Sequence, residues 1–228
     1  MIDLQDLQFR WSRSGPPVLV LPSLHIGDGE RVFIEGPSGS GKTTLLNLLG
    51  GIVLPDRGQI AISGQDLKLL RQAERDAFRA KHIGFIFQMF NLVPYLSILD
   101  NVTLPCRFSE ARRAQAGARS GDPESEARRL LSHMGLDAEQ FGNRPVTQLS
   151  VGQQQRVAAA RSLIGGPALV IADEPTSALD SGTRARFLDL LFEEIERTGA
   201  TLVFVSHDSA LGQRFDRTLS LPELNKAA

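Results

Sequence analysis

A glycine-rich stretch near the start of the chain reads Gly36-Pro37-Ser38-Gly39-Ser40-Gly41-Lys42-Thr43. It fits the pattern G-x-x-x-x-G-K-[ST], in which glycines let backbone N–H groups turn inward around an anion. The apolar run at residues 31–35 predicts a strand before it, and residues 42–49 predict a helix after it, whose N-terminus adds a positive dipole end. The alternative is a glycine-rich structural turn, but the filled anchor positions and the correct flanks favour a phosphate-binding loop.

Lys42 and Thr43 have specific expected roles in this loop. We expect the Lys42 ammonium to lie between the β- and γ-phosphates of a nucleotide as a point charge, and the Thr43 hydroxyl to bind Mg²⁺. The nucleotide-binding residues predicted along the loop and into the helix are Gly36, Pro37, Ser38, Gly39, Ser40, Gly41, Lys42, Thr43 and Thr44.

The length and composition of the chain exclude several classes of protein. Its 228 residues suit one large domain, or a core with a subdomain, and its 42% hydrophobic content is enough for a sizeable core. The net charge of −1 gives no basic field for nucleic acid. Cys106 is the single cysteine, so an internal disulfide is excluded, which fits a reducing compartment.

The sequence predicts no targeting or membrane-spanning segment. The N-terminus lacks the basic and then apolar stretches of a signal peptide. The longest apolar stretch, residues 45–54, is shorter than the roughly 18 to 20 residues that a membrane span needs. A role in a membrane process would therefore require a membrane-embedded partner.

Hydrophobic patterning along the chain predicts the order of its elements. The polar stretch at residues 114–126 is expected to be a loop between two helices, within a strand-free region at residues 97–134. The late strands are almost entirely apolar, as in a parallel sheet covered on both faces. The pattern predicts an α/β core interrupted by a mostly helical insert. Strands are expected at residues 2–11, 18–26, 31–35, 58–63, 83–87, 168–172 and 201–205, and further helices at residues 67–81, 153–164 and 184–197.

Polar residues follow two of the late strands, at the edge where ligands bind in parallel sheets. Asp173 is expected to hold the Mg²⁺ shell through water, and Glu174 to reach the water that attacks the γ-phosphate. His207 is expected to hydrogen-bond the γ-phosphate and orient that water. The alternatives are a solvated acidic turn and an incidental histidine, and the phosphate loop makes both of them less favoured.

The stretch Leu149-Ser150-Val151-Gly152-Gln153-Gln154-Gln155-Arg156 narrows the prediction. It resembles the LSGGQ signature of the ABC ATPases, and it ends 17 residues (173 − 156) before Asp173, as in that family. The resemblance implies a second anion cradle, built by Leu149, Ser150, Val151, Gly152 and Gln153, that caps the ATP held by a partner subunit. Val151 stands where the family usually has glycine, and its stiffness could lower affinity for the capped phosphate. The alternative is a simple helix N-cap at Ser150.

Further positions match the same family in order along the chain. Gln88 matches the Q-loop glutamine, which contacts Mg²⁺ and the attacking water, and His207 matches the switch histidine. Asp180 lies in a D-loop, Ser177-Ala178-Leu179-Asp180, that crosses the dimer interface in the family. Trp11 matches the aromatic residue that stacks on adenine, with ordinary packing as its alternative.

The resemblance covers essentially the whole chain and implies its domain organisation. It implies the ABC ATPase fold of the P-loop NTPases, with a parallel-sheet core and an N-terminal antiparallel β portion. We expect a single domain over residues 1–228, with its core at about 1–88 and 160–228 and a helical subdomain at about 89–159.

The stretches Gly84–Val102 and Gly152–Ala158 resemble a particular branch of the family, the MacB/LolD-type ATPases of macrolide export and lipoprotein release. Import ATPases share much of the sequence of these two stretches. The resemblance implies an ATP-dependent homodimer with two ATPs and Mg²⁺, a separate membrane permease and a peripheral position on the cytoplasmic face. Two alternatives are a soluble ABC ATPase without a transporter, such as an iron–sulfur cluster assembly factor, and a regulatory ATPase without turnover. The retained Glu174 and His207 argue against the second.

Overall fold

The computed structural model describes residues 1–227, which divide into two compact units. The first unit contains Met1–Arg79 together with the chain from Thr201 onward, and the second contains Ala80–Ala200. Among the described residues, no helix is both long enough and apolar enough to cross a bilayer. The domain boundaries expected from the sequence remain a prediction.

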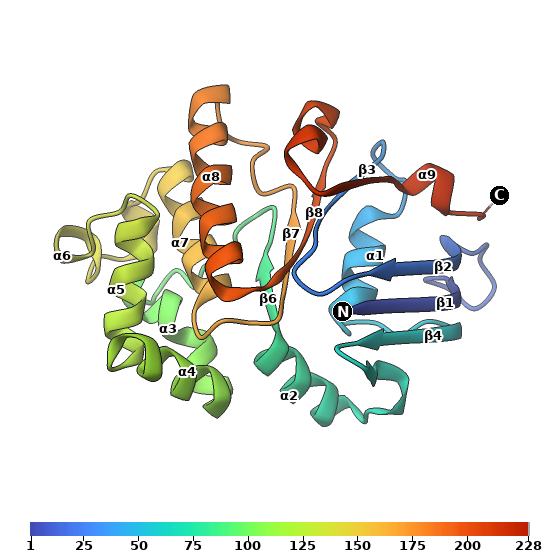
Figure 1. Ribbon diagram of the computed structural model, residues 1–228, viewed down its shortest axis with the longest axis horizontal. Coiled ribbons are helices and arrows are strands. Elements are labelled where there is room, and N and C mark those ends of the chain that lie inside the picture. Colours follow the sequence, from blue (N-terminus) through green and yellow to red (C-terminus); the bar gives the residue numbers. More distant parts are fainter. Residues whose placement is uncertain (228) are drawn as a thin grey trace. The chain divides into compact units, whose positions relative to one another are not determined.

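An antiparallel sheet of four strands, in the order β2-β1-β4-β5, forms much of the first unit (Figure 1). Its central strand β1 places Ile2 opposite Ile26 of β2 and Ile62 of β4. Both strands were predicted from the sequence, and buried residues alternate with more exposed ones along each of them, apart from two adjacent exposed residues in the middle. The bounds of the strands are β1 Ile2–Phe9, β2 Leu19–Ile26, β4 Arg57–Ile62 and β5 Gln65–Asp66.

A β-bulge interrupts the pairing of β1 with β4. Asp6 of β1 is left-handed, with φ of 47°, and the register shifts between Gln5 and Gln8. Gly58 of β4 faces this point with φ of 84°, and a Cβ there would lie 2.4 Å from the carbonyl oxygens of Gln5 and Asp6. Only glycine fits so close to the partner backbone.

The first unit also contains three parallel strands. β3 (Arg31–Glu35) lies between β8 (Thr201–Ser206) and β9 (Arg217–Ser220). Phe33, Phe204 and Phe215 pack together beside them, with ring centroids 5.1 to 6.1 Å apart. The other elements of this unit are the helix α1 (Lys42–Leu49), most of α2 (Gln72–His82) and the short segments η1 (Leu67–Leu69), η3 (Ser209–Arg214) and α9 (Leu221–Leu224).

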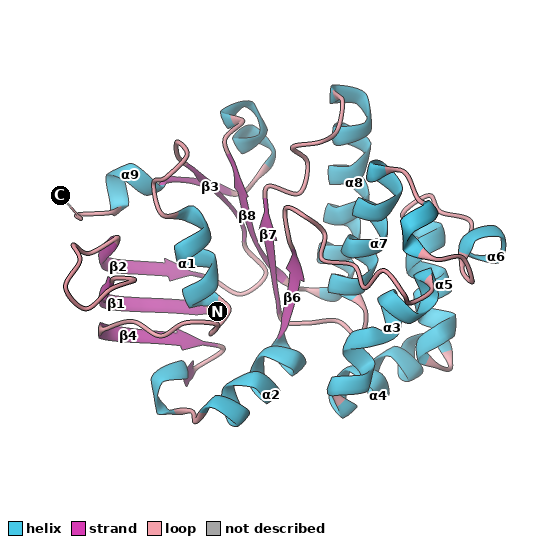
Figure 2. Ribbon diagram, turned by 180° about the vertical axis from the view of Figure 1, so that it is seen from behind, coloured by secondary structure: helices cyan, strands magenta, loops and turns pink. Residues whose placement is uncertain are grey.

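The second unit combines a parallel pair of strands with most of the helices (Figure 2). β6 (Ile83–Ile86) pairs with β7 (Leu169–Asp173), so that Ile86 lies opposite Ala172. The helices α3, α4, α5 and α7 pack on one another. The bounds are α3 Ile98–Phe108, α4 Glu110–Ser120, α5 Pro123–His133, α6 Ala138–Phe141, η2 Val146–Gln148, α7 Val151–Leu163 and α8 Ser181–Thr198.

Two sequence predictions about helices are wrong. Residues 114–126 are not a loop, because α4 continues to Ser120 and α5 begins at Pro123. The helix α4 thus ends six residues later than the expected start of the loop, and Asp122 begins α5 directly by accepting from the backbone N–H groups of Glu124 and Ser125. The single helix expected at residues 67–81 is split into η1 and α2 by an extended residue at Leu70.

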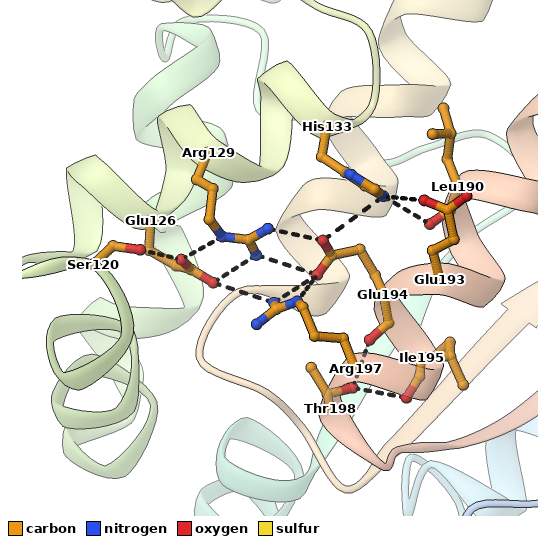
Figure 3. Close-up of polar contacts among 10 residues, drawn as sticks. All are labelled: Ser120, Glu126, Arg129, His133, Leu190, Glu193, Glu194, Ile195, Arg197 and Thr198. Carbon is orange, nitrogen blue, oxygen red and sulfur yellow. Dashed lines mark hydrogen bonds and ion pairs between the residues drawn. The ribbon is translucent and has the colours of Figure 1, made fainter.

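A buried ionic network joins α5 to α8 within the second unit (Figure 3). The Arg129 guanidinium donates to both carboxylate oxygens of Glu126, at 2.8 and 2.9 Å, and of Glu194, at 2.8 and 3.1 Å. Arg197 donates to Glu194 at 2.6 Å, and the Ser120 hydroxyl donates to Glu126. Both carboxylates are almost completely buried, so these ion pairs hold the two helices together inside the protein rather than on its surface.

Candidate active site

The phosphate loop follows β3 and runs into α1, as the sequence predicted. Gly39 and Gly41 have φ of 82° and 98°, and the N-cap position of α1 at Gly41 has no side-chain hydrogen bond. The start of α1 is therefore not capped by a side chain, and its positive dipole end lies at the phosphate loop. The Lys42 side chain is 8% exposed, and its Nζ donates to the carbonyl oxygens of Gly36, at 2.6 Å, and Pro37, at 2.9 Å. The loop thus holds its own ammonium group in place.

The Ser40 hydroxyl is the observation that fits a phosphate most directly. Its Oγ is buried and has no hydrogen-bond partner among the described residues. Buried polar groups are almost always paired, because an unpaired one loses its hydrogen bond to water without replacement. A phosphate oxygen in the loop would give this hydroxyl an acceptor. The residues present therefore fit the triphosphate of a nucleotide.

His207 lies at the same edge of the first unit as the phosphate loop. β3 and β8 are parallel, with Glu35 opposite Ser206. Gly36 and His207 are the next residues on these neighbouring strands, so both follow the carboxyl ends where ligands bind in parallel sheets. The structure thus brings together the two predicted phosphate contacts of this unit.

The second unit brings together the two remaining candidates for catalysis, Gln88 and Glu174, with the expected magnesium ligand Asp173. Ile86 of β6 lies opposite Ala172 of β7, and Gln88, Asp173 and Glu174 follow at the same ends of these strands. Glu174 is left-handed, with φ of 46°. A residue with a side chain is rarely held in this conformation, and such strain is concentrated at functional sites.

The signature stretch begins α7 with a capping box. The Ser150 hydroxyl accepts from the Gln153 backbone N–H at 3.3 Å, and the Gln153 side chain accepts from the Ser150 N–H at 2.9 Å. The simple N-cap considered as an alternative is therefore present. It does not exclude a second role for Ser150 towards an anion, because the Ser150 hydroxyl can donate a hydrogen bond as well as accept one. Val151 is half exposed at the first position of the helix.

The predicted D-loop lies beside the signature stretch. A Cβ on Gly152 would lie 3.5 Å from a methyl group of Leu179. Asp180 is the N-cap of α8 and accepts from the Thr183 N–H at 3.0 Å. Hydrogen bonds from the backbone and then the side chain of Thr183 lower the pKa of the Asp180 carboxyl. Asp180 therefore has a structural role, and its role at a dimer interface remains a prediction.

Trp11 follows β1 and is 60% exposed. Its ring contacts Phe9 edge to face, with the centroids 4.9 Å apart. Burial in a core does not account for this residue, because most of the ring faces solvent. Stacking on adenine remains the prediction for it.

Two buried polar side chains that the sequence analysis missed hold the segment after Gln88. The Arg161 guanidinium of α7 donates to the carbonyl oxygens of Phe90 and Asn91. The Asn101 side chain of α3 accepts from the Val93 N–H at 2.8 Å and donates to its carbonyl oxygen at 3.0 Å. A charged residue in the otherwise apolar stretch at 157–164 was a usable signal for Arg161.

Comparison with known proteins shows which family this chain belongs to. Residues 21–177 match the family described as ABC transporter. The chain belongs to the ABC transporter family. This ABC ATPase is 42% identical over 202 residues to the lipoprotein-releasing system ATP-binding protein LolD of Bacteroides fragilis, with 89% of each chain covered. It is 41% identical over 226 residues to the macrolide export ATP-binding/permease protein MacB of Rhodopseudomonas palustris, which covers 96% of this chain and 32% of that one.

A solved structure agrees with this assignment. The ABC ATPase matches the ATP-binding cassette MJ0796, solved as a dimer in a post-hydrolysis state bound to ADP and Pi. The TM-score is 0.84 at 38% identity, with 96% of this chain and 94% of that chain covered. The predicted ABC ATPase fold, with parallel strands and an N-terminal antiparallel sheet, is confirmed. So is the prediction of an ATP-binding, ATP-hydrolysing transporter subunit related to LolD and MacB, rather than a soluble assembly factor.

Proposed function

We propose that two copies of this ABC ATPase form a dimer on binding ATP, with two nucleotides at the interface. Each ATP is held by Lys42 of one chain and capped by Ser150 and Gly152 of the other. The main support for nucleotide binding is the phosphate loop, in which hydrogen bonds hold the Lys42 ammonium and the buried Ser40 hydroxyl has no partner among the described residues. One loop and one signature per chain make two complete sites only in a pair of chains. The dimeric state of the related cassette MJ0796 supports this arrangement.

In this proposal the Mg²⁺ ion is held by oxygen ligands of the chain together with the nucleotide. Thr43 supplies a hydroxyl, Gln88 an amide oxygen and Asp173 a carboxylate, the last through water. These are the hard oxygen donors that Mg²⁺ prefers. When bound, the ion neutralises charge on the phosphate oxygens.

Glu174 and His207 are the proposed catalytic residues, assisted by Gln88. The Glu174 carboxylate polarises the attacking water and accepts its proton, and the His207 imidazole contacts the γ-phosphate and orients the water. The left-handed backbone at Glu174 supports this role, because strained backbone of this kind is concentrated at functional sites. Trp11 stacks on the adenine ring through its exposed face.

The dimer drives a separate membrane permease of the MacB/LolD type, from a peripheral position on the cytoplasmic face. The names of the relatives support this branch, since one belongs to a lipoprotein-releasing system and the other joins an ATP-binding part to a permease. We also propose that the chain is one ABC ATPase domain whose helical subdomain lies at about residues 89–159. The cargo is chosen by the permease.

Substitution of Glu174 by Gln tests the catalytic assignment. The amide keeps the size of the side chain but cannot accept the proton. Loss of one pre-aligned contact of this kind typically costs a factor of about 10² to 10³ in turnover. Glu174→Gln should therefore bind ATP normally and hydrolyse it at least a hundredfold more slowly in a steady-state phosphate-release assay. Glu110→Gln, an exposed carboxylate of α4, is the matched control and should keep wild-type turnover.

Wild-type turnover by Glu174→Gln would show that another group activates the water. A second assay, with and without a detergent-solubilised membrane permease of the MacB/LolD type, tests the transport coupling. The proposal predicts that the permease changes the ATPase rate. An ATPase rate that is the same with and without this permease contradicts the coupling.

A further inference from the structure

The turn at residues 87–91, which contains Gln88, has an unusual backbone. Phe90 and Asn91 are both left-handed, with φ of 59° and 48°. Asparagine tolerates this conformation, but a phenylalanine Cβ clashes with its own carbonyl oxygen there. The turn is closed by hydrogen bonds from the Phe90 N–H to Phe87, at 2.9 Å, and from the Asn91 N–H to Met89, at 2.6 Å. Two consecutive left-handed residues persist only where the surroundings hold them.

Arg161 supplies that hold. Its side chain extends from the last turn of α7 and is 9% exposed. One guanidinium nitrogen donates to the Asn91 carbonyl at 2.6 Å, and another donates to the Phe90 carbonyl at 2.5 Å. Burial lowers the pKa of this guanidinium to about 10, so it remains charged at neutral pH. Both strained residues are therefore fixed through their carbonyl groups by one buried cation.

The chemistry of this contact requires arginine. The guanidinium is planar and rigid, and its donors diverge at a fixed angle, so it can bind two neighbouring carbonyls at once. A lysine ammonium at the same position keeps the charge but is a single point and lacks the fork. The contact links residues 70 positions apart in the chain. It joins the helix that starts with the signature to the turn that carries Gln88.

We propose that Arg161 is a positioning residue for the reaction, which ties the Gln88 turn to the signature helix so that the two segments move as one piece. A displacement of the exposed Met89 side of the turn is then passed to α7, and a displacement of Ser150 is passed back to Gln88. This inference rests on the proposed function for the role of Gln88. The mechanical link itself rests only on the contacts of Arg161.

Hydrogen exchange of the full chain tests the link without reference to activity. Arg161→Met and Arg161→Lys should both speed amide exchange across residues 88–92 at least tenfold, because neither side chain can hold two carbonyls. Arg112→Lys is the matched control. Arg112 is also a buried arginine with a pKa lowered to about 10 that donates to backbone carbonyls, but it does so at Ile83 and Ile164. Its loss should speed exchange around residues 81–84 and leave residues 88–92 protected.

Kinetics then test the role in the reaction. Arg161→Lys should lower kcat for ATP hydrolysis about tenfold while the KM for ATP stays within twofold, because the phosphate loop is untouched. A merely structural loss would lower the apparent kcat through a smaller active fraction, also with an unchanged KM, so kcat is normalised to the fraction of chains that bind ATP in a fluorescent-nucleotide titration. Unchanged exchange at residues 88–92 in both variants would overturn the link, and faster exchange with unchanged kcat would overturn the positioning role. Absence of hydrolysis in the wild type would instead refute the proposed function, and the exchange result would still stand.

Discussion

Removal of Arg129 is expected to destabilise the fold strongly, because this residue neutralises two buried carboxylates. Glu126 and Glu194 have 0% and 1% of their surface exposed, and the Arg129 guanidinium binds both oxygens of each. In Arg129→Met the apolar volume is kept, but the permanent positive charge beside the two carboxylates is reduced to Arg197, with the His133 imidazole 3.8 Å from Glu194. Arg197 contacts Glu194 at 2.6 Å and reaches Glu126 only at 3.7 Å.

The magnitude follows from the cost of leaving a charge buried without a partner. Breaking a buried ion pair in this way costs roughly 3 to 5 kcal/mol. About one third of the Arg129 side chain is exposed, so the lower end applies, about 3 kcal/mol. For a chain of this size that corresponds to a fall in melting temperature of roughly 6 to 12 °C. Arg113→Met is the control, since Arg113 pairs with Glu110 on the surface at 3.5 Å and its loss should cost less than about 1 kcal/mol.

The pH dependence of this destabilisation has a defined sign. Burial raises the pKa of Glu194, but hydrogen bonds and charges from Arg129 and Arg197 outweigh burial and lower it below its ordinary value of 4.5. In the wild type, the stability from this group is present above that ordinary value and is lost as the pH falls through the lower folded pKa. Without Arg129, burial dominates and raises the pKa of the carboxyl, so the variant loses stability as the pH rises.

The assay is urea unfolding of both proteins between pH 4 and pH 8. The difference in unfolding free energy should be largest near pH 8 and should shrink towards pH 4. Addition of Glu194→Gln to Arg129→Met should recover part of the loss, because it removes one uncompensated charge. A difference below about 1 kcal/mol, the value typical of surface pairs, or one that does not change with pH, would show that Arg129 does not neutralise these two buried carboxylates.

Three further outcomes are expected. Lys42→Ala should abolish ATP binding in a fluorescent-nucleotide titration, and unchanged affinity would remove Lys42 from the site. Gly84→Ala should destabilise the fold by roughly 1 to 3 kcal/mol in thermal unfolding, because its Cβ would lie 2.2 Å from the Ser162 carbonyl oxygen, whereas Gly117→Ala in open space on α4 should be neutral or stabilising. Trp11→Ala should weaken ATP binding while Trp11→Phe retains it, and equal affinities would exclude stacking.

The sequence predicted elements well where local signals agree with the fold. The helix Lys42–Leu49 was located from the glycine loop before it and the apolar residues within it. β3 was located from its short apolar run. In contrast, β9 was missed because Arg217–Ser220 is short and polar, and only pairing with β3 makes it a strand. The loop expected at residues 114–126 was wrong. Gly117 and Ser120 are typical loop residues and led to that prediction, whereas cap residues such as Asp122, which mark the ends of α4 and α5, were not recognised.

The motifs predicted the residues of the candidate site better than they predicted the contacts that hold those residues in place. Each motif consists of residues close together in the sequence, so a single chain shows it completely. The hydrogen bond from Arg161 to Asn91 joins residues 70 positions apart in the chain. It also depends on the left-handed backbone of Phe90 and Asn91, which no sequence pattern near Phe90 predicts. Likewise, the sequence analysis considered an N-cap at Ser150, but it missed the other half of the capping box, in which the Gln153 side chain accepts from the Ser150 N–H.

In the proposed dimer each ATP is shared between two chains, and one pair of variants tests this sharing. Glu174→Gln with Mg-ATP should elute in size exclusion with light scattering at twice the mass of the 24.9 kDa chain. Glu174→Gln combined with Ser150→Phe should bind ATP with the same affinity, because its phosphate loop is intact, yet remain a monomer. If the double variant still forms a dimer that retains ATP, the signature does not cap the nucleotide of the other chain and the account is wrong.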